Sequence, residues 1–371
     1  MDFSLSKQDQ LFLQMIREFA EKVDESERFP METVQKMAKL GIMGIPFPVE
    51  YGGAGGNNIL YTMAVEELSR VCATTGVIVS AHTSLCCAPI MEHGTPEQKA
   101  KYLPKLTSGE WIGAFGLTEP NAGTDASAQQ TFAVKEGDHY VLNGSKIFIT
   151  NAGYAHVYII MAMTDKSKGT KGISAFIVEK DFPGFSIGKK EKKMGIRGSA
   201  TCELIMENCI VPAENLLGQE GKGFGIAMKT LDGGRIGIAS QALGIAQGAM
   251  DETVKYVKER KQFGKSLGQF QNTQFQLADL QTKVEASRLL VRQAAYKKDL
   301  KVPYSADAAM AKLFAAETAM EVTTKAVQFH GGYGYTREYP VERMMRDAKI
   351  TEIYEGTSEV QRMVIAANLL K

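Results

Sequence analysis

The chain has 371 residues, 44% of them hydrophobic, and its 43 basic and 42 acidic side chains leave a formal net charge of +1. A chain of this length can bury a large core and should divide into two or three domains of about 100–150 residues each. The balanced charge provides no broad basic field, so we expect no binding of nucleic acid. We also expect no membrane span, because no stretch approaches the ~18 apolar residues that a span needs.

The cysteines and histidines argue against a disulfide framework and against a metal site. The five cysteines are odd in number and include no Cys-x-x-Cys pair, which suits a reducing compartment. The five histidines are scattered without close pairing, so we expect structural or surface roles for them and no bound metal. The N-terminus has no basic segment followed by an apolar run, and we expect a cytoplasmic protein.

The first part of the chain, residues 4–110, is predicted to be mainly helical. Ser6 is a plausible N-cap for a helix whose apolar residues recur at helical spacing, and residues 62–71 repeat the pattern. Thr95 followed by Pro96 predicts the start of another helix, with proline at its first position.

Residues 111–211 have the character of strands. Asn143-Gly144 between two apolar runs predicts a tight hairpin turn. Further strands are predicted at residues 157–163, 173–178 and 202–210, with a polar loop at residues 166–172.

From about Lys222 onward the helical pattern returns. Long helices are predicted at residues 225–259, 269–297 and 305–328, and a final one from about residue 358. The order is therefore helical, then β, then helical. No β-α-β alternation is visible, so a doubly wound Rossmann sheet is disfavoured.

A glycine cluster at residues 331–334 follows a predicted helix and not a strand, so it fails the context test for a dinucleotide-binding fingerprint. Two interpretations remain open. The cluster is either a helix C-cap and turn, or a place where the backbone approaches a phosphate or adenosine group closely, helped by Gln328.

Glu355, within residues 351–359, is the candidate catalytic base. The glycine that follows it removes the Cβ that would obstruct a ligand near the backbone. The alternative is a carboxylate at a helix N-terminus, where it would stabilise the helix dipole. Glu352, three residues earlier, suits a surface or structural role.

Three segments resemble signatures of the acyl-CoA dehydrogenase family. Residues 116–125 resemble its first signature, residues 328–347 its second, and residues 353–357 the segment that carries its catalytic base. The resemblance covers essentially the whole chain and is closest to the short-chain, butyryl-CoA branch. It implies an α+β multidomain fold with an N-terminal α-helical domain, a middle β-barrel or sandwich domain and a C-terminal four-helix bundle, over residues 1–112, 113–221 and 222–371.

The resemblance also implies a reaction. Family members bind FAD non-covalently, remove the α-hydrogen of an acyl-CoA as a proton and pass the β-hydrogen as hydride to flavin N5, giving a trans-2-enoyl-CoA. An α-C–H beside a thioester is a poor acid, so the site must supply a base and stabilise charge on the thioester oxygen. Glu355 is the expected base, and burial beside the acyl chain should raise its pKa. Its backbone N–H and a flavin hydroxyl are the expected donors to the thioester oxygen.

Cofactor contacts follow from the same resemblance. Thr150 would reach flavin N5, and Phe148 stands where many relatives have Trp. Without the resemblance, residues 147–150 would be an ordinary strand after a hairpin, and Arg260 a solvated cation at a helix end. The residues expected to contact FAD are Phe115, Leu117, Thr118, Gly123, Thr124, Phe148, Ile149, Thr150, Arg260, Phe263, Gln271, Gln328, Gly331, Gly332, Thr357, Ser358 and Glu359.

Substrate contacts are carried over in the same way. Asp232 and Arg235 lie three positions apart on one face of a predicted helix and could be only an intrahelical ion pair. The resemblance makes residues 232–235 a wall of the channel for the CoA pantetheine, with the glycines letting the ligand lie close to the backbone. The residues expected to contact substrate are Thr124, Asp232, Gly233, Gly234, Arg235, Tyr354 and Gly356.

The resemblance also implies partners. Arg260, Gln271 and residues 328–332 are expected to reach the FAD of a neighbouring subunit, so we expect an obligate homotetramer, a dimer of dimers. A short-chain acyl-CoA is the expected substrate, and an electron-transferring flavoprotein the expected electron acceptor. The alternatives are a butyryl-CoA-forming reductase in a bifurcating complex, an acyl-CoA oxidase and a non-catalytic acyl-CoA-binding scaffold. Between Phe19 and Phe29 the chain is shorter than typical relatives.

Overall fold

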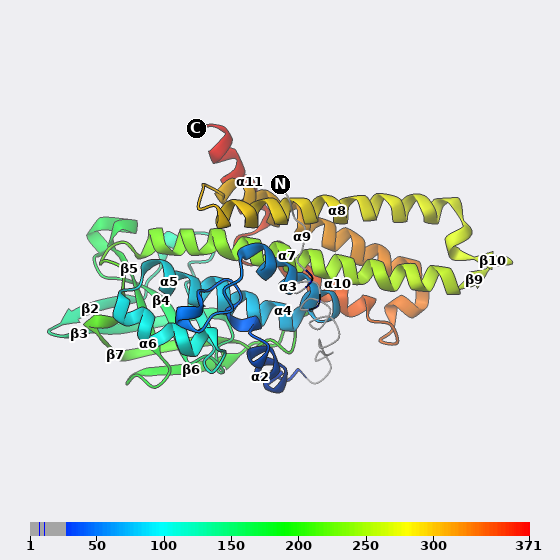
Figure 1. Cartoon of the computed structure of the whole chain (residues 1–371). Helices are drawn as coiled ribbons and strands as arrows, with labels where there is room; N and C mark the ends of the chain where they lie inside the picture. Colours follow the sequence, from blue (N-terminus) through cyan, green and yellow to red (C-terminus); the bar gives the residue numbers. More distant parts are fainter. Residues whose placement is uncertain (1–6, 8–10, 12–26) are drawn as a thin grey trace.

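The computed structural model describes residues 7, 11 and 27–371. The helix predicted after Ser6, and most of the shortened segment before Phe29, lie outside the described residues. The remaining chain forms a group of short helices, a β-sheet and a set of long helices, in that order along the sequence (Figure 1). Helical, β and helical parts therefore follow one another as predicted.

The N-terminal helices are defined by local capping. Asn57 accepts a hydrogen bond from the Leu60 amide at 2.8 Å and caps the second of them. Thr95 and Gln98 form a reciprocal capping box with Pro96 at the first helical position, which confirms the helix start predicted there. The helices are α2 Met31–Lys39, α3 Asn58–Val71, α4 Ala73–Ser80, α5 Ala88–His93 and α6 Pro96–Thr107.

One helical stretch corrects the expectation that no segment is long and apolar enough for a membrane span. A π-helical segment, Ala81–Cys87, joins α4 to α5, and the resulting 21-residue stretch Ala73–His93 has a mean hydropathy of 1.3. Within the tested window, 89% of the residues are buried inside the protein. The apolar surface of this stretch is therefore used by the protein's own core.

The middle part is an eight-stranded sheet in the order β6-β7-β3-β2-β4-β5-β8, with β1 paired in parallel to β4. Strand β4 is buried along its whole length, as its continuous apolar sequence requires. The strands predicted at 157–163, 173–178 and 202–210 are confirmed as β4, β5 and β7. The strand bounds are β1 Gly113–Gly116, β2 Phe132–Glu136, β3 His139–Thr150, β4 Val157–Met163, β5 Ile173–Glu179, β6 Phe185–Lys190, β7 Thr201–Pro212 and β8 Leu216–Leu217.

The hairpin turn predicted at Asn143-Gly144 is wrong, because both residues lie inside the single long strand β3. The register between β3 and β7 shifts between Leu142 and Gly144, so the dipeptide forms a β-bulge. Gly144 has φ +141°, and a Cβ there would lie 2.5 Å from Thr131 Oγ1. Gly144 is therefore required by a bulge and by the close approach of Thr131. The chain reverses earlier, between Glu136 at the end of β2 and His139 at the start of β3.

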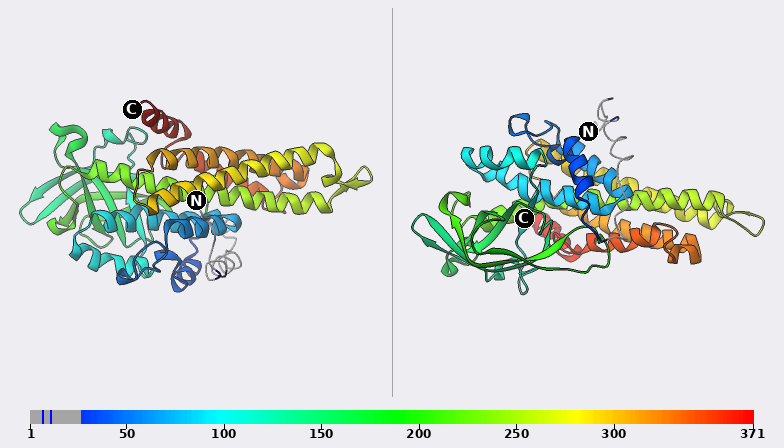
Figure 2. Two further views of the ribbon diagram at one scale, coloured as in Figure 1. Left: turned by 45° about the horizontal axis from the view of Figure 1, so that its top comes forward. Right: turned by 90° about the horizontal axis from the view of Figure 1, so that it is seen from below.

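The C-terminal part consists mainly of long helices, and they confirm the helices predicted from the sequence. Figure 2 shows them extending away from the sheet. A two-stranded hairpin, β9 Lys261–Gln262 and β10 Lys265–Ser266, connects the first two. The helices are α7 Gly223–Glu259, α8 Gln271–Asp299, α9 Ser305–His330, α10 Val341–Lys349 and α11 Ser358–Leu369.

A buried ion network joins the N-terminal helices to the long ones. Glu66 of α3 accepts a hydrogen bond at 2.6 Å from Arg292 and one at 3.0 Å from Arg288, both on α8. Glu66 and Arg292 are buried, so removing either one would leave a buried charge with fewer partners. This network fixes α3 against α8, and α3 also packs along α7, which carries part of the candidate site.

Candidate active site

Glu355 lies in the short connection between a 3₁₀ turn, Ile350–Glu352, and helix α11. Its backbone has φ +52°, and Gly356 after it has φ +93°. A left-handed conformation is uncommon for a residue with a side chain, and such strain persists only where the surroundings enforce it. Thr357, and not Glu355, caps α11 by accepting a hydrogen bond from the Val360 amide at 3.3 Å.

The carboxylate of Glu355 is turned towards helix α7. A Cβ at Gly234 would lie 2.0 Å from Glu355 Oε2 and 2.8 Å from Leu85 Cδ2. Only glycine at position 234 leaves room for the carboxylate at this place. The Oε2 atom is buried without a hydrogen-bond partner among the residues that the structure describes. Burial raises the pKa of Glu355 to about 8, although Lys312 and Arg235 oppose the shift.

Two cations face this carboxylate from different helices. Arg235 of α7 is buried and donates to Asp232 at 2.6 Å, so the predicted ion pair on one face of α7 is present. Asp232 also accepts from Ser305 at 2.9 Å. Lys312 of α9 is completely buried, and its Nζ donates to the Gly356 carbonyl at 2.8 Å. The long side chain of Lys298 occupies the space beside Gly233, with Nζ 3.0 Å from a Cβ built there.

Tyr354 is held by helix α7. Its hydroxyl donates to Gln241 Oε1 of α7, and Gln241 in turn donates to the Ala73 carbonyl at 3.2 Å. Burial raises the pKa of Tyr354 well above its ordinary value. The hydroxyl therefore stays a neutral donor that fixes the segment bearing Glu355, and a direct contact of Tyr354 with substrate stays a prediction.

The loop after β1 runs beside strand β3, so two of the predicted cofactor segments lie together. The Ile147 amide donates to the Thr118 carbonyl at 2.8 Å. Lys146, completely buried on β3, donates to the Leu117 carbonyl at 3.1 Å and to Glu119 at 2.7 Å. Glu119 also accepts from the Thr131 amide at 3.0 Å. The buried Lys146–Glu119 ion pair thus ties the loop to β3, together with these backbone hydrogen bonds.

Replacing Lys146 with methionine is expected to release this loop. Glu119 would remain buried without its cation, a loss that typically costs about 3–5 kcal/mol. We expect a lower FAD content in the purified variant, measured from the ratio of flavin to protein absorbance, and an earlier unfolding transition. Lys135→Met on strand β2 is the matched control, because Lys135 is exposed. Equal FAD content in both variants would show that the ion pair does not shape the cofactor site.

Phe148 stands out from strand β3 at a second irregularity. It has φ +59°, lies between the register positions of Lys146 and Ile149, and is 61% exposed. A bulge re-aims a side chain, and here it turns an aromatic ring into solvent-accessible space while Ile149 stays buried. Thr150 is half-buried, Phe115 is half-buried on β1, and Gly123 and Thr124 are exposed in the loop.

A second group of predicted cofactor residues lines a cavity of about 440 Å³. Arg260, Gln328, Gly331 and Gly332 belong to it, and the Arg260 guanidinium lies 5.8 Å from the Tyr333 ring centroid. The glycines confirm the expected helix end, because Gly331 is the C-cap of α9 with φ +59°. A Cβ at either glycine would have no atom within 4 Å.

The two groups lie at opposite ends of helix α7. The helix starts at the sheet and ends at the β9–β10 hairpin, where Arg260 and Phe263 follow it (Figure 1). Phe263 is 94% exposed, and Gln271 is the first residue of α8 at that same end. Within one chain, residues 115–150 and residues 260–271 are therefore separated by the length of α7.

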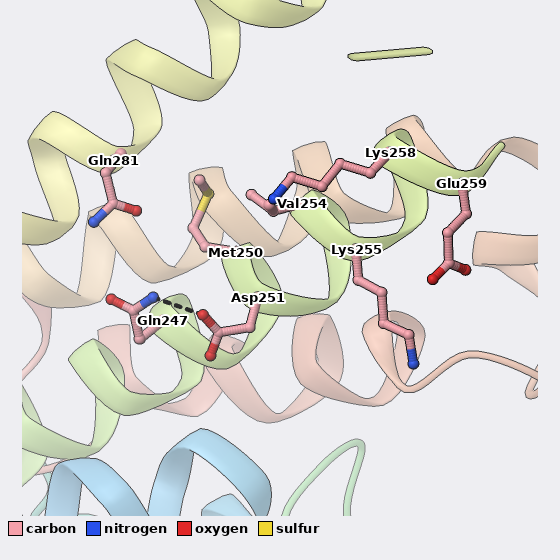
Figure 3. A pocket seen from close by; sticks show the side chains of 8 residues that line it. All are labelled: Gln247, Met250, Asp251, Val254, Lys255, Lys258, Glu259 and Gln281. Carbon is pink, nitrogen blue, oxygen red and sulfur yellow. Dashed lines mark hydrogen bonds between the residues drawn. The ribbon is translucent and has the colours of Figure 1, made fainter. Parts of the chain in front are cut away.

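Another cavity, of about 380 Å³, contains none of the predicted site residues. It lies between α7 and α8, and Figure 3 shows its mixed lining of acidic, basic and amide side chains. Gln247 donates to Asp251 at 3.0 Å within it. It is a surface depression away from Glu355.

Three domain models of one family match the chain. The N-terminal, middle and C-terminal domains of acyl-CoA dehydrogenase match residues 7–110, 114–209 and 221–370. The chain belongs to the acyl-CoA dehydrogenase family. The fold expected from the sequence is therefore confirmed, as is an oxidoreductase that carries FAD. Solved relatives are described in complex with FAD or its reduced form.

Individual relatives of this acyl-CoA dehydrogenase cover its whole length. The "Acyl-CoA dehydrogenase, short-chain specific" of Clostridium acetobutylicum is 65% identical over 100% of both chains. The solved structure of butyryl-CoA dehydrogenase from Megasphaera elsdenii is 54% identical, with a TM-score of 0.98 over 100% of both chains. A solved structure described as "Electron transferring flavoprotein of Acidaminococcus fermentans: Towards a mechanism of flavin-based electron bifurcation" is 57% identical, with a TM-score of 0.98 over 100% of both chains.

The residues present fit FAD in several places. His330 Nε2 and Ser358 Oγ are buried polar atoms without a partner in the part of the chain that is described. His330 lines the Arg260 cavity, and Ser358 is in the predicted cofactor segment that also contains Thr357 and the exposed Glu359. Open space beside Gly331 and Gly332 leaves room for a ligand against the backbone.

Sequence reasoning missed several residues of the site. Lys312, Gln361 and Gln241 hold the segment around Glu355, and Lys146 holds the loop after β1. A signal existed for Lys312, since it is a lone cation in the alanine-rich stretch 308–316. A single charge in an otherwise apolar helix face requires a buried partner. The glutamines gave no comparable signal.

Proposed function

We propose that this acyl-CoA dehydrogenase oxidises short-chain acyl-CoA thioesters, converting butyryl-CoA to crotonyl-CoA, with Glu355 as the base that takes the α-proton. The observation that carries the proposal is the buried Oε2 of Glu355, which has no hydrogen-bond partner in the described part of the chain and faces Arg235 and Lys312. The short-chain substrate is supported by the 65% identical relative described as short-chain specific.

The reaction breaks two C–H bonds and forms one C=C bond. The α-hydrogen leaves as a proton to Glu355, and the β-hydrogen leaves with its electron pair to bound FAD, which supplies the hydride acceptor. Burial suits the base, because a carboxylate with a pKa of about 8 takes a proton more readily than an exposed one. The apolar side chain of Leu85 borders the same place on α7.

The proton transfer needs the ionised form of Glu355. With a pKa of about 8, only about one tenth of the free enzyme has this form at pH 7. The rate of the half-reaction should therefore rise with pH through this value. Arg235 and Lys312 extend the active range downward because their positive charge favours the carboxylate over the acid.

Two chains are required for one complete cofactor site in this proposal. Residues 115–150 would contact the flavin end, and Arg260, Phe263, Gln271 and Gln328 of another copy would contact the pyrophosphate and adenosine. The separation of the two groups along α7 supports this sharing. An Arg guanidinium suits a pyrophosphate because it forms charge-assisted hydrogen bonds. This sharing requires at least two copies, and we propose a homotetramer, as the family resemblance implies.

An electron-transferring flavoprotein is the proposed redox partner. Support comes from the 57% identical structure described in the context of flavin-based electron bifurcation. The same similarity favours a second candidate function, the reduction of crotonyl-CoA to butyryl-CoA within a bifurcating complex. Both directions use the same residues, since Glu355 would then return the proton to the α-carbon.

An anaerobic titration tests the proposal. The FAD-loaded enzyme is mixed in turn with butyryl-, hexanoyl-, octanoyl- and isobutyryl-CoA while the visible flavin band is recorded. We expect butyryl-CoA to bleach the band at the lowest concentration. Preferential bleaching by a longer or branched thioester would reject the butyryl-CoA assignment and keep the reaction. A band that none of the four changes would reject dehydrogenation, and crotonyl-CoA added to the dithionite-reduced enzyme would then test the reverse reaction.

A further inference from the structure

Lys312 is a buried cation whose contact with the turn that bears Glu355 is not yet part of the reaction scheme. It sits on α9, is completely buried, and its ammonium group donates to a backbone carbonyl, that of Gly356, at 2.8 Å. Burial lowers the pKa of Lys312 to about 8, although the nearby Glu355 opposes the shift. The charged form therefore still predominates at pH 7. Burying a cation is energetically unfavourable. The contact of Lys312 with Gly356, the residue after the proposed base, suggests that the buried cation has a function at this turn.

A second buried side chain forms hydrogen bonds with the same turn. Gln361 of α11 is completely buried, and its Nε2 donates to the Gly356 carbonyl at 2.8 Å and to the Glu355 carbonyl at 3.3 Å. Both carbonyls of the left-handed Glu355-Gly356 pair thus accept hydrogen bonds from fixed donors. A strained backbone persists where contacts over-determine it, and here the contacts come from α9 and α11.

Lys312 differs from the other ionisable groups near Glu355 in how available its charge is to the carboxylate. Arg235 faces it from α7 but is already paired with Asp232. Tyr61 of α3 and Tyr354 also face the carboxylate, and burial raises the pKa of each phenol so that it stays neutral. Of the two acidic neighbours of Lys312 on the C-terminal segment, Glu352 pairs with Lys349 at 2.6 Å and Glu359 is exposed. Lys312 is therefore the cation whose charge is most available to Glu355.

We propose that Lys312 is a positioning residue for the α-proton transfer: with Gln361 it holds the left-handed turn that aims Glu355 at α7, and its positive charge favours the ionised base. The inference rests on the proposed function of Glu355. The two side chains have different roles in this proposal. Gln361 only fixes the conformation of the turn, whereas Lys312 fixes the turn and also provides a positive charge.

The test compares the pH dependence of flavin reduction by butyryl-CoA in four variants. Lys312→Met removes the charge and the donor, Lys312→Gln keeps a donor without the charge, and Gln361→Leu removes the other donor. Lys325→Met, an exposed lysine on the same helix, is the matched control. FAD content and thermal unfolding establish that each variant is folded, and Lys312→Gln replaces Lys312→Met if the latter does not fold.

Loss of the cation raises the pKa of Glu355, so the pH profile should move to higher pH. We expect an alkaline shift of about one pH unit and an approximately tenfold slower reduction at pH 7 for both Lys312 variants, with little change in KM. Gln361→Leu should slow reduction without moving the profile, and Lys325→Met should match the wild type. A wild-type profile in both Lys312 variants would overturn the proposal, even if their rates fell.

An infrared measurement separates this inference from the proposed function. The protonated carboxyl band of Glu355, assigned by its absence in Glu355→Gln, is followed against pH without substrate. We expect its midpoint to be higher in Lys312→Met than in the wild type. If no thioester reduces the wild-type flavin, the proposed function is rejected. The midpoint of the carboxyl band still shows whether the charge of Lys312 affects the pKa of Glu355. An unchanged midpoint would overturn the role of the Lys312 charge.

Discussion

Glu355→Gln is expected to slow flavin reduction by butyryl-CoA by about 10⁴-fold, the upper range for removal of a general base. Glutamine keeps the size and shape of the side chain but cannot accept the α-proton. The amide should still fit beside Gly234, so the variant should fold and keep its FAD. Rapid anaerobic mixing with the flavin absorbance as readout measures the rate.

Glu352→Gln is the matched control for this variant. Glu352 lies three residues earlier, is half-buried and pairs with Lys349 at 2.6 Å. Its neutralisation should leave the rate within a few-fold of the wild type. Near-normal reduction by a folded, flavin-loaded Glu355→Gln enzyme would remove Glu355 from the mechanism.

Gly234→Ala should be the second most damaging change, although it adds only one methyl group. The new Cβ would meet Glu355 Oε2 at 2.0 Å, so the carboxylate must move away. A displacement of about 1 Å at a reacting group can cost about 10²-fold in rate. We expect that loss in the rate of flavin reduction, and the FAD content of the purified variant shows whether the neighbouring residues 357–359 still hold the cofactor.

The control is Gly225→Ala on the same helix. A Cβ at Gly225 has no atom within 4 Å, so the substitution meets open space. Alanine is favoured over glycine in a helix by about 1 kcal/mol, and this variant should be active and slightly more stable. A Gly234→Ala enzyme as active as Gly225→Ala would show that the close approach of Glu355 to α7 is not needed.

The long helices and most strands could be predicted because their signals are local. The helix beginning at Pro96 carries its capping residues in the sequence, and the apolar run of β4 specifies a buried strand by itself. The Asn143-Gly144 bulge could not be predicted, because the dipeptide is equally suited to a turn. What decides between the two is the pairing with β7 and the proximity of Thr131, both of which are set by the tertiary fold.

The candidate site also contains residues that local sequence motifs indicate and residues whose role only the tertiary fold reveals. Glu355 and the Asp232–Arg235 pair are readable from short motifs, and the structure brings the base and the pair to one place on α7. The reason for Gly234 was not readable, since its neighbour Glu355 is more than 100 residues away in the sequence. For Lys312 the alanine-rich stretch indicates a buried partner, but only the packing of α9 against the C-terminal segment identifies that partner as the Gly356 carbonyl.

The most direct test of the account is transfer of solvent deuterium to the α-carbon of butyryl-CoA. The FAD-loaded enzyme is incubated anaerobically with butyryl-CoA in D₂O, and the recovered thioester is analysed by mass spectrometry and NMR. If Glu355 exchanges its proton with solvent and returns it in the reverse reaction, the wild type should incorporate deuterium at the α-carbon and Glu355→Gln should not. Incorporation by Glu355→Gln at the wild-type rate would contradict the assignment of Glu355 as the base.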